Sequence, residues 1–430
     1  TGLMANLSST AEGTIAVTLE DDTLTAVSTT VTNNAVNAPT SFTVNSGTFD
    51  ADDTIVLAGS RAITVAATDS LNITTGAASA SISQATNKTA VVNADLMADD
   101  ANLTISGAGS FTVTGLMANL SSTAEGTIAV TTANVVNQTI ALGSGTAGTR
   151  TINATAMSDG GILTLTGAGA ATVTLSAGDL AAGDYTGNLT VTTGSGVSSI
   201  VTGSGNDTVT MNVLTGIDAL NANGGNDTLV LTGASTGNVS VDLQISDADQ
   251  LTSSDDSPNL VQQNFENVDA SAMTGGGLIA WAKSIGSRII GSNTGNDTLN
   301  SGSGADTLSG GGGDDTFVFN ATTDLAGDSI DGGTGTDAIS LDAGGAGSYD
   351  FTTAGVSISN VDKLAINANE AFTVKLSDDF NGNDGNVEVV NSFGATSVGI
   401  TVDASAFTGG TAALNVSATN FDGADTFIGT

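Results

Sequence analysis

The chain of 430 residues contains no cysteine and no histidine, and it has only 7 lysine and arginine residues. The missing cysteine excludes disulfides, thiolate zinc sites and cysteine nucleophiles, and the missing histidine excludes serine–histidine–aspartate triads and histidine zinc sites. The 44 acidic residues give a formal net charge of −37, which argues against nucleic acid as a partner because phosphate binding needs Lys and Arg. Long apolar runs are missing too, so we expect no membrane insertion.

Proline and aromatic residues are also scarce, with 2 Pro, 13 Phe, 2 Tyr and 1 Trp, whereas glycine reaches 56. A β-sandwich usually builds its core around large aromatic side chains, but a narrow solenoid fills its core with stacked Val, Ile, Leu, Ala and Thr. The apolar fraction of 39% argues against the disorder that such acidity would otherwise suggest. The composition therefore favours a folded solenoid.

Internal repeats run along the chain. Thr1–Thr18 recurs unchanged as Thr114–Thr131, and Val268–Gly276 closely matches Val402–Gly410. Such duplication is expected where each unit buries its apolar face only against a neighbouring unit. Because the chain starts without an initiator Met and its last residues, Gly423–Thr430, stop inside a motif, we expect it to be a fragment of a longer chain.

Between the repeats, apolar and polar residues alternate with period two, as in Leu103–Ser106 and Phe111–Thr114. Short alternating runs rich in β-branched residues and spaced by Gly, Asn and Asp predict strands and turns. We therefore predict an all-β fold: a repetitive parallel β-solenoid or β-roll with short strands and Gly/Asn/Asp turns, with sandwich-like β segments as an alternative for parts of it. One stretch, Gly277–Ile290, has a helical pattern instead.

The strongest motif is a run of three contiguous nonapeptides, Ser292–Asn300, Ser301–Ser309 and Gly310–Val318. Each copy has Gly at its fourth position, Asp at its sixth and an apolar residue at its eighth. Six residues form a turn, in which Gly permits a positive φ and lets carbonyl oxygens converge, while Asp adds a charged oxygen. Further copies occur at Gly332–Ser340, Thr202–Thr210, Ala222–Val230 and Asn420–Ile428.

This pattern resembles the RTX (repeat-in-toxin) calcium-binding family, in which two nonapeptides make one coil of a parallel β-roll and calcium lies between stacked turns. The resemblance implies Ca²⁺ as the cofactor, since calcium accepts six to eight oxygen ligands in flexible geometry. It also implies that Asp297 and Asp315 share one edge of the roll while Asp306 faces the opposite edge. The residues that it assigns to the metal are Asp297, Asp306, Asp315, Asp337, Gly295, Gly304, Gly313, Asn296, Asp314, Asp207, Asp227 and Asp425.

The isolated copies leave two interpretations open. Asp207, Asp227 and Asp425 could each bind calcium, or each could form an Asx-type β-turn that closes a strand. Several copies have a residue other than Gly at position one or two, as at Ser292 and Thr202, and this weakens the expectation of full roll geometry there.

Changes in composition near Thr193–Ser199, Asp247–Pro258 and Gly344–Ser348 predict four regions. They are a Thr/Ser-rich β repeat region (1–198), a β region with isolated RTX-like turns (199–258), an RTX-like calcium-binding β-roll (259–345) and a C-terminal β repeat region (346–430).

The resemblance extends to RTX-type surface-layer proteins. It implies a structural subunit, not an enzyme, of a secreted bacterial surface layer or extracellular filament, self-assembling through calcium-bridged acidic edges at the cell surface. Scarce calcium inside the cell would keep such a chain unfolded, as type I secretion requires. Two alternatives stay open: an RTX-like adhesin or biofilm-matrix protein that binds a surface or a cell-surface polysaccharide, and the calcium-binding tail of a secreted enzyme.

Overall fold

The computed structural model describes residues 6–11, 13–20, 26–35, 41–145, 148–197, 199–213, 219–245, 249–253, 261–342, 347–367, 370–380, 382, 386–392, 399–407, 413–417, 421 and 424–429. Within these ranges the chain forms strands, turns and bends, and it contains no helix that could span a bilayer. It divides into two compact units. Unit 1 comprises Thr1–Val209 and Ile217–Gly225, and unit 2 comprises Thr210–Gly216 and Asn226–Thr430.

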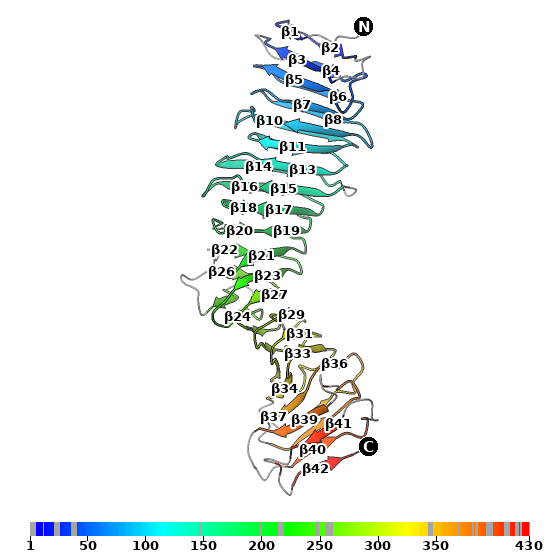
Figure 1. Ribbon diagram of the computed structural model, residues 1–430, viewed down its shortest axis with the longest axis vertical. Helices are drawn as coiled ribbons and strands as arrows, with labels where there is room; N and C mark the ends of the chain where they lie inside the picture. The colour runs from blue at the N-terminus through cyan, green and yellow to red at the C-terminus, as the bar shows by residue number, and fades with distance from the viewer. Residues whose placement is uncertain are drawn as a thin grey trace. The chain divides into compact units, whose positions relative to one another are not determined.

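Unit 1 is a parallel solenoid whose consecutive strands alternate between two sheets, so that strand n pairs with strand n+2 (Figure 1). One sheet contains β1 (Leu7–Ser9), β3 (Ser28–Asn33), β5 (Thr54–Gly59), β7 (Leu71–Thr74), β9 (Thr89–Asn93), β11 (Ser110–Leu116), β13 (Ile128–Thr132), β15 (Arg150–Ala154), β17 (Ala171–Leu175) and β19 (Leu189–Thr192). The other contains β2 (Ile15–Thr18), β4 (Phe42–Asn45), β6 (Ile63–Ala67), β8 (Ala80–Gln84), β10 (Asn102–Gly107), β12 (Asn119–Ser122), β14 (Asn137–Leu142), β16 (Ile162–Gly167), β18 (Asp179–Ala181), β20 (Ser199–Val201) and β22 (Ala219–Asn221).

The core of unit 1 is built from columns of apolar side chains that point inward from successive coils. Val44 pairs with Val65, Val65 with Ile82, and Ile82 with Ile105, and all four side chains are completely buried. Their neighbours along each strand face outward, as the period-two pattern predicts. Burying one such side chain stabilises the fold by about 1.5–3 kcal/mol, but only while the adjacent coil is present to cover it.

Unit 2 continues the same principle with three sheets. The first contains β23 (Thr228–Ala234), β27 (Asn267–Thr274), β29 (Arg288–Ile290), β31 (Thr307–Gly312), β33 (Ser329–Thr334) and β36 (Ser357–Ser359). The second contains β24 (Val239–Asp242), β28 (Leu278–Trp281), β30 (Thr298–Asn300), β32 (Thr316–Phe319), β34 (Ala338–Leu341), β37 (Lys363–Ile366), β39 (Asn386–Asn391) and β41 (Ala413–Val416), and β25 (Leu251–Ser253) joins it antiparallel to β24. Two further strands are β21 (Thr208–Asn212) and β26 (Val261–Gln263).

The third sheet of unit 2 contains β35 (Gly347–Asp350), β38 (Phe372–Lys375), β40 (Ile400–Asp403) and β42 (Thr426–Ile428), all paired in parallel. Buried aromatic residues of this sheet and of the turns that follow its strands pack together: Tyr349 lies 5.4 Å from Phe372 and Phe351 lies 4.9 Å from Phe380, measured between ring centroids. Parallel pairing here agrees with a solenoid and not with the sandwich-like alternative. The predicted all-β, repetitive parallel solenoid is confirmed.

The helical pattern at Gly277–Ile290 was misleading. This segment forms β28, a turn closed by the Gly286 N–H donating to the Lys283 carbonyl at 3.2 Å, and β29. Leu278 and Ala280 face inward, whereas Ile279 and Trp281 face outward. The hydrogen bonds that β28 makes to β24 and β30 on either side outweigh the local propensity.

Candidate metal centre

An aspartate stands immediately before many of the strands, where a turn enters the sheet. We call these residues the strand-entry aspartates. Each is followed by one residue and then by an apolar residue of the strand, as in Asp297-Thr298-Leu299. They precede β5, β21, β23, β30, β31, β32, β33, β34, β37 and β42, and are Asp53, Asp207, Asp227, Asp297, Asp306, Asp315, Asp328, Asp337, Asp362 and Asp425.

Four of them form a first ladder along the second sheet of unit 2: Asp297, Asp315, Asp337 and Asp362. The backbone N–H of Asp297 donates to Asp315 Oδ1 at 2.8 Å, and that of Asp315 donates to Asp337 Oδ1 at 2.9 Å. The N–H of Asp337 donates to Asp362 Oδ2 at 2.9 Å, and Leu278 N–H donates to Asp297 Oδ1. Each carboxylate thus joins its own coil to the preceding one.

A second ladder follows the first sheet of unit 2. Ser287 N–H donates to Asp306 Oδ1 at 2.7 Å, and Asp306 N–H donates to Asp328 Oδ1 at 2.8 Å. Asp297 and Asp315 therefore share one edge while Asp306 precedes a strand of the other sheet, as predicted. The 18-residue coil that links Thr298 to Thr316 is the one built from the tandem nonapeptides.

Ser301 contacts both aspartates of the second ladder. Its Oγ lies 2.9 Å from Asp306 Oδ2, 2.8 Å from Asp328 Oδ2 and 3.0 Å from the Asp324 carbonyl oxygen. One hydroxyl can donate only one proton, so it cannot satisfy three acceptors at once. Asp306 Oδ2 also accepts the Gly302 N–H at 2.9 Å, but Asp328 Oδ2 and the Asp324 carbonyl oxygen still compete for the single proton of Ser301. This competition calls for a proton on one carboxyl group or for a cation.

Glycines leave room for oxygen atoms beside the first ladder. A Cβ added to Gly291 would clash with Asp297 Oδ2 and with the Gly310 carbonyl oxygen. A Cβ on Gly310 would clash in the same way with Asp315 Oδ2 and the Gly332 carbonyl oxygen. The pattern repeats at Gly332, which faces Asp337 Oδ2 and the Asn360 carbonyl oxygen. We call these three places the oxygen cradles, because each brings a carboxylate oxygen and a backbone carbonyl oxygen together.

All carboxylates of the two ladders except that of Asp362, which is half-buried, are removed from water. Asp297, Asp306, Asp315, Asp328 and Asp337 have at most 1% of their surface exposed. Burial raises the pKa of Asp297 to about 8, that of Asp328 to about 7 and that of Asp315 to about 6, and neighbouring carboxylates add to the effect. Burial also raises the pKa values of Asp306 and Asp337. Such a row of buried anions is unfavourable unless positive charge is supplied.

The chemistry of these residues fits calcium. Within the described residues, Asp315 Oδ2 and Asp337 Oδ2 are buried without a hydrogen-bond partner, and both belong to oxygen cradles. No three acidic side chains of the described residues gather at one point, so carbonyl oxygens would have to complete the coordination. Calcium accepts such mixed sets of carboxylate and carbonyl oxygens. When bound, it would supply the positive charge that the buried carboxylates lack.

The glycines predicted for the site act in two ways. Gly313 has a φ of 124°, which only glycine adopts readily. Gly295 and Gly304 have no positive φ. They are needed for close approach, because a Cβ on Gly295 would meet the backbone of Gly276, and one on Gly304 that of Gly286. The explanation by positive φ is therefore wrong for these two positions.

Asn296 and Asp314 lie outside the ladders. Both are exposed, and they form a separate chain of contacts in which Asp314 N–H donates to Asn296 Oδ1 at 2.9 Å and Thr336 N–H donates to Asp314 Oδ1 at 2.8 Å. Their assignment to the metal stays a prediction.

The isolated copies adopt the same strand-entry position. Asp207 and Asp227 are buried, and Leu189 N–H donates to Asp207 Oδ1 at 2.7 Å. Asp425 is half-buried and accepts from Ile400 N–H at 2.7 Å. These contacts are the ones expected of a carboxylate that closes a turn, and calcium binding at these three residues stays a prediction.

Sequence reasoning missed Asp328, Asp362, Ser301 and the oxygen-cradle glycines. Asp328 escaped because Ala326 occupies the position where the nonapeptide has Gly. The shorter signal was present: Asp328-Ser329-Ile330 has the same Asp-x-apolar order as the recognised copies. Searching for that triplet before each predicted strand would have found it.

Replacing Asp328 by Ala tests the second ladder. The Asp306 N–H would lose its acceptor in a buried place, so in saturating calcium we expect the free energy of unfolding to fall by about 1–3 kcal/mol. The matched control is Asp159→Ala, an exposed aspartate of unit 1 outside every nonapeptide copy, whose loss should change stability by about 0.5 kcal/mol or less. Denaturant titration of both variants gives the comparison, and equal effects would contradict the ladder.

A comparison with family models finds the RTX calcium-binding nonapeptide repeat, in four copies, over residues 292–326. This segment, which contains Asp297, Asp306 and Asp315, is a calcium-binding repeat, and such repeats are typical of secreted bacterial proteins. The further copy predicted at Gly332–Ser340 and the isolated copies lie outside the match. Comparisons with curated proteins and with solved structures give no match.

Proposed function

We propose that this chain is a structural subunit of a secreted bacterial surface layer or extracellular filament that assembles when calcium is present. It would work at the cell surface, with further copies of itself as the main partner, and without catalytic activity. The proposal depends on one observation above all: buried carboxylates of successive coils stack into ladders at the edges of a solenoid.

The ladders support a calcium-dependent scaffold because they make the fold itself depend on the ion. With a net charge of −37, the chain repels itself, and that repulsion opposes compaction and self-association. A site that binds only the folded state adds about 2.7 kcal/mol of stability when calcium exceeds the dissociation constant about 100-fold. A few such sites equal a large part of the 5–15 kcal/mol that stabilises an ordinary domain.

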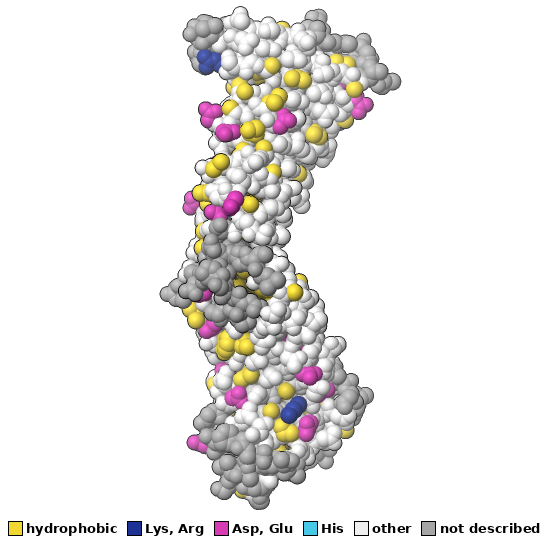
Figure 2. Space-filling view, turned by 60° about the vertical axis from the view of Figure 1, so that its left-hand side comes forward, with side chains coloured by type: hydrophobic (Ala, Val, Ile, Leu, Met, Phe, Trp, Pro, Cys, Tyr) yellow, Lys and Arg dark blue, Asp and Glu magenta, His cyan; other side chains and the backbone are white. Residues whose placement is uncertain are grey.

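The surface supports polar contacts between subunits. On the face shown in Figure 2, hydrophobic side chains are scattered among polar side chains and backbone, and acidic side chains lie among them. Scattered apolar residues are normal for a soluble surface and do not form a docking patch. Association through divalent ions that bridge acidic groups agrees better with such a surface than burial of a large apolar area.

The ladders also weigh against catalysis by carboxylates. A glycosidase needs two carboxyl groups that flank a substrate bond. Here the buried aspartates accept hydrogen bonds from backbone N–H groups of the neighbouring coil, a structural use. An adhesin would use the same calcium-loaded scaffold, and it differs in needing a target other than itself.

Calcium alone should drive assembly. We expect the purified chain to form ordered sheets or filaments in millimolar calcium and to return to single subunits in EGTA, as seen by negative-stain imaging and light scattering. Asp315→Asn should weaken assembly, because Asp315 carries a buried oxygen without a partner among the described residues. The control is Asp159→Asn, at an exposed aspartate outside every nonapeptide copy.

Persistent monomers with and without calcium would remove the surface-layer proposal. Monomers that assemble only after a polysaccharide is added would favour the adhesin. Replacing calcium by magnesium offers a further check. Magnesium requires a stricter octahedral geometry, so it should not drive assembly in place of calcium.

A further inference from the structure

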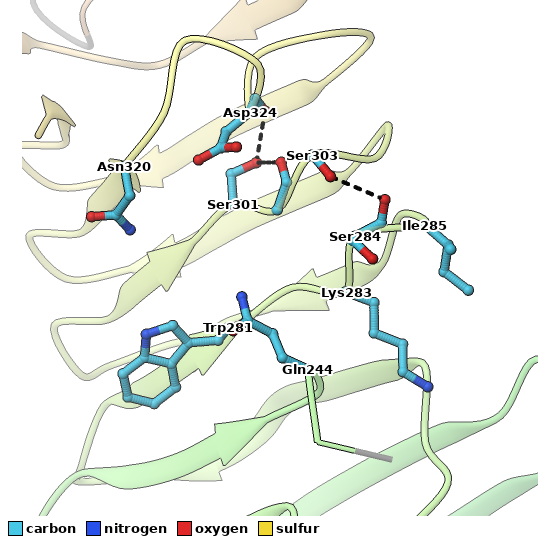
Figure 3. A pocket seen from close by; sticks show the side chains of 10 residues that line it. Gln244, Trp281, Lys283, Ser284, Ile285, Ser301, Ser303, Asn320 and Asp324 are labelled. Atoms are coloured by element: carbon cyan, nitrogen blue, oxygen red, sulfur yellow. Dashed lines mark hydrogen bonds between the residues drawn. The ribbon is translucent and has the colours of Figure 1, made fainter. Parts of the chain in front are cut away.

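Unit 2 has a pocket of about 730 Å³ beside the second ladder. It is formed by the segments that follow four neighbouring strands of the second sheet. These segments are Gln244 after β24, Trp281–Ile285 at the end of β28 and in the turn that follows, Ser301–Ser303 after β30, and Asn320 with Asp324 after β32. Figure 3 shows Trp281 and Asn320 on one side and Ile285 on the other, with the serines between them. Sites for small ligands typically enclose about 300–1,000 Å³, so the size is suitable.

Trp281 is the only tryptophan of the chain, and the fold does not need it for the core. Along β28, Leu278 and Ala280 fill the interior, while Trp281 points outward and is only half-buried. Its indole N–H has no hydrogen-bond partner among the described residues. Elsewhere in unit 1 and unit 2 such outward positions carry mostly small polar residues, as the Thr and Ser of the alternating strands do. A large flat ring at the wall of a pocket is suited to stacking on a ligand.

The charged groups around the pocket are already ion-paired or hydrogen-bonded within the protein. Lys283 Nζ lies 2.5 Å from Glu266 Oε1, and both side chains are mostly buried. The other oxygen of Glu266 accepts the Asp227 N–H at 2.8 Å. Asp324 is buried, and its Oδ2 accepts the Ala321 N–H at 2.9 Å. The pocket therefore has no uncommitted cation for an anionic ligand, and the net charge of −37 repels anions further.

The remaining polar groups are neutral. The exposed side chains of Gln244, Ser284, Ser303 and Asn320 line the pocket with two amides and two hydroxyls. Gln244 Nε2 also donates to the Ala282 carbonyl oxygen at 3.2 Å, and Ser303 Oγ donates to the Ser284 carbonyl oxygen at 3.3 Å, so the oxygens of these two side chains are left to accept from a ligand. Amides and hydroxyls both donate and accept hydrogen bonds, which matches the hydroxyl groups of a sugar. Ile285, which is 78% exposed, adds an apolar contact at the rim.

We propose that this pocket binds a neutral oligosaccharide, with a sugar ring stacked on Trp281 and its hydroxyls bonded to the amides and hydroxyls opposite. A phosphorylated ligand would lack a cation, and a hydrophobic peptide would leave the polar groups unpaired. The site goes beyond self-assembly and does not depend on it. It would let a calcium-folded scaffold hold glycan.

Because Trp281 is the sole tryptophan, its fluorescence reports on this pocket alone. We expect titration of the full, calcium-loaded chain with neutral hexasaccharides of glucose, mannose, galactose and N-acetylglucosamine to give a saturable change in emission for at least one of them. Calorimetry with that sugar should show binding that falls by about tenfold or more in Trp281→Ala and in Asn320→Ala. Trp281→Phe, which keeps a ring, should retain part of the affinity.

The control is Val136→Ala, an exposed apolar residue of unit 1, which should bind as the unchanged chain does. No emission change with any of the four sugars would overturn the proposal, as would tighter binding of inorganic phosphate than of every sugar. Calcium-driven assembly should persist in Trp281→Ala. Loss of sugar binding with intact assembly separates this site from the proposed scaffold function.

Discussion

Without calcium, the chain should become less stable as the pH rises from 6 to 8. Burial raises the pKa values of Asp297, Asp328 and Asp315 to about 8, 7 and 6, whereas an aspartate in the unfolded chain has a pKa of about 3.9. The folded state therefore holds these protons more tightly than the unfolded state does. This contribution to stability is fully present below about pH 4 and is lost as the pH rises through the folded pKa values.

Calcium should reverse the trend. Its carboxylate ligands must be deprotonated, so the calcium-loaded chain should gain stability as the pH rises. Circular dichroism melts of the calcium-stripped chain should show a midpoint at pH 8 that is about 8 °C or more below that at pH 6, because the three pKa values together correspond to a change of about 4 kcal/mol. Ordinary carboxyl groups are already ionised in this range, so general charge repulsion cannot produce the slope.

Asp297→Asn is the matched variant for this experiment. The amide does not titrate, but its Oδ1 can still accept the Leu278 N–H. The slope between pH 6 and 8 should become shallower in this variant. A calcium-stripped chain that gains stability over the same interval would show that the buried carboxylates do not carry the charge assigned to them.

Gly310→Ala should remove the central oxygen cradle. A Cβ at this position would clash with Asp315 Oδ2 and with the Gly332 carbonyl oxygen, so both oxygens must move apart. Overpacking of this kind typically costs about 1–3 kcal/mol. The stabilisation by calcium at that place should be lost as well, about 2.7 kcal/mol at a 100-fold excess of the ion. Calorimetric titration with calcium and thermal melts with and without it measure the two effects separately.

Gly224→Ala is the control, because a Cβ there meets no atom within 4 Å and the backbone has no positive φ. Its stability and calcium binding should match those of the unchanged chain. If Gly310→Ala binds calcium as well as Gly224→Ala does, the oxygen cradle is not a calcium site.

Much of the fold was open to prediction from local pattern. Alternation such as Phe111-Thr112-Val113 assigns strands and their inner faces because the side chains of a strand point to opposite sides in turn, and Phe111 and Val113 are indeed buried. The helical pattern at Gly277–Ile290 failed for the opposite reason. Its strands exist because neighbouring coils supply hydrogen bonds, and those neighbours are not part of the local pattern.

The candidate site divides in the same way. The tandem nonapeptides predicted Asp297, Asp306 and Asp315, because motif spacing can be read directly from the sequence. The nonapeptide motif did not predict Ser301, Asp328 or Asp362. Their importance comes from contacts across 22 to 27 residues, as between Ser301 and Asp328 or between Asp315 and Asp337. Which residues make such contacts depends on the length of each coil, because that length decides which residues of adjacent coils become neighbours.

The amino-acid sequence alone determined that this protein is an acidic, thiol-free, repetitive β protein with calcium-binding nonapeptides, because composition, period and motif spacing are local quantities. Only the tertiary structure decided which carboxylates stack into ladders, which glycines open space for oxygen atoms, and that Trp281 faces a pocket. Stacking brings together residues a whole coil apart, and coil length varies from one turn of the solenoid to the next, so these neighbours can be identified only after the chain has wound up.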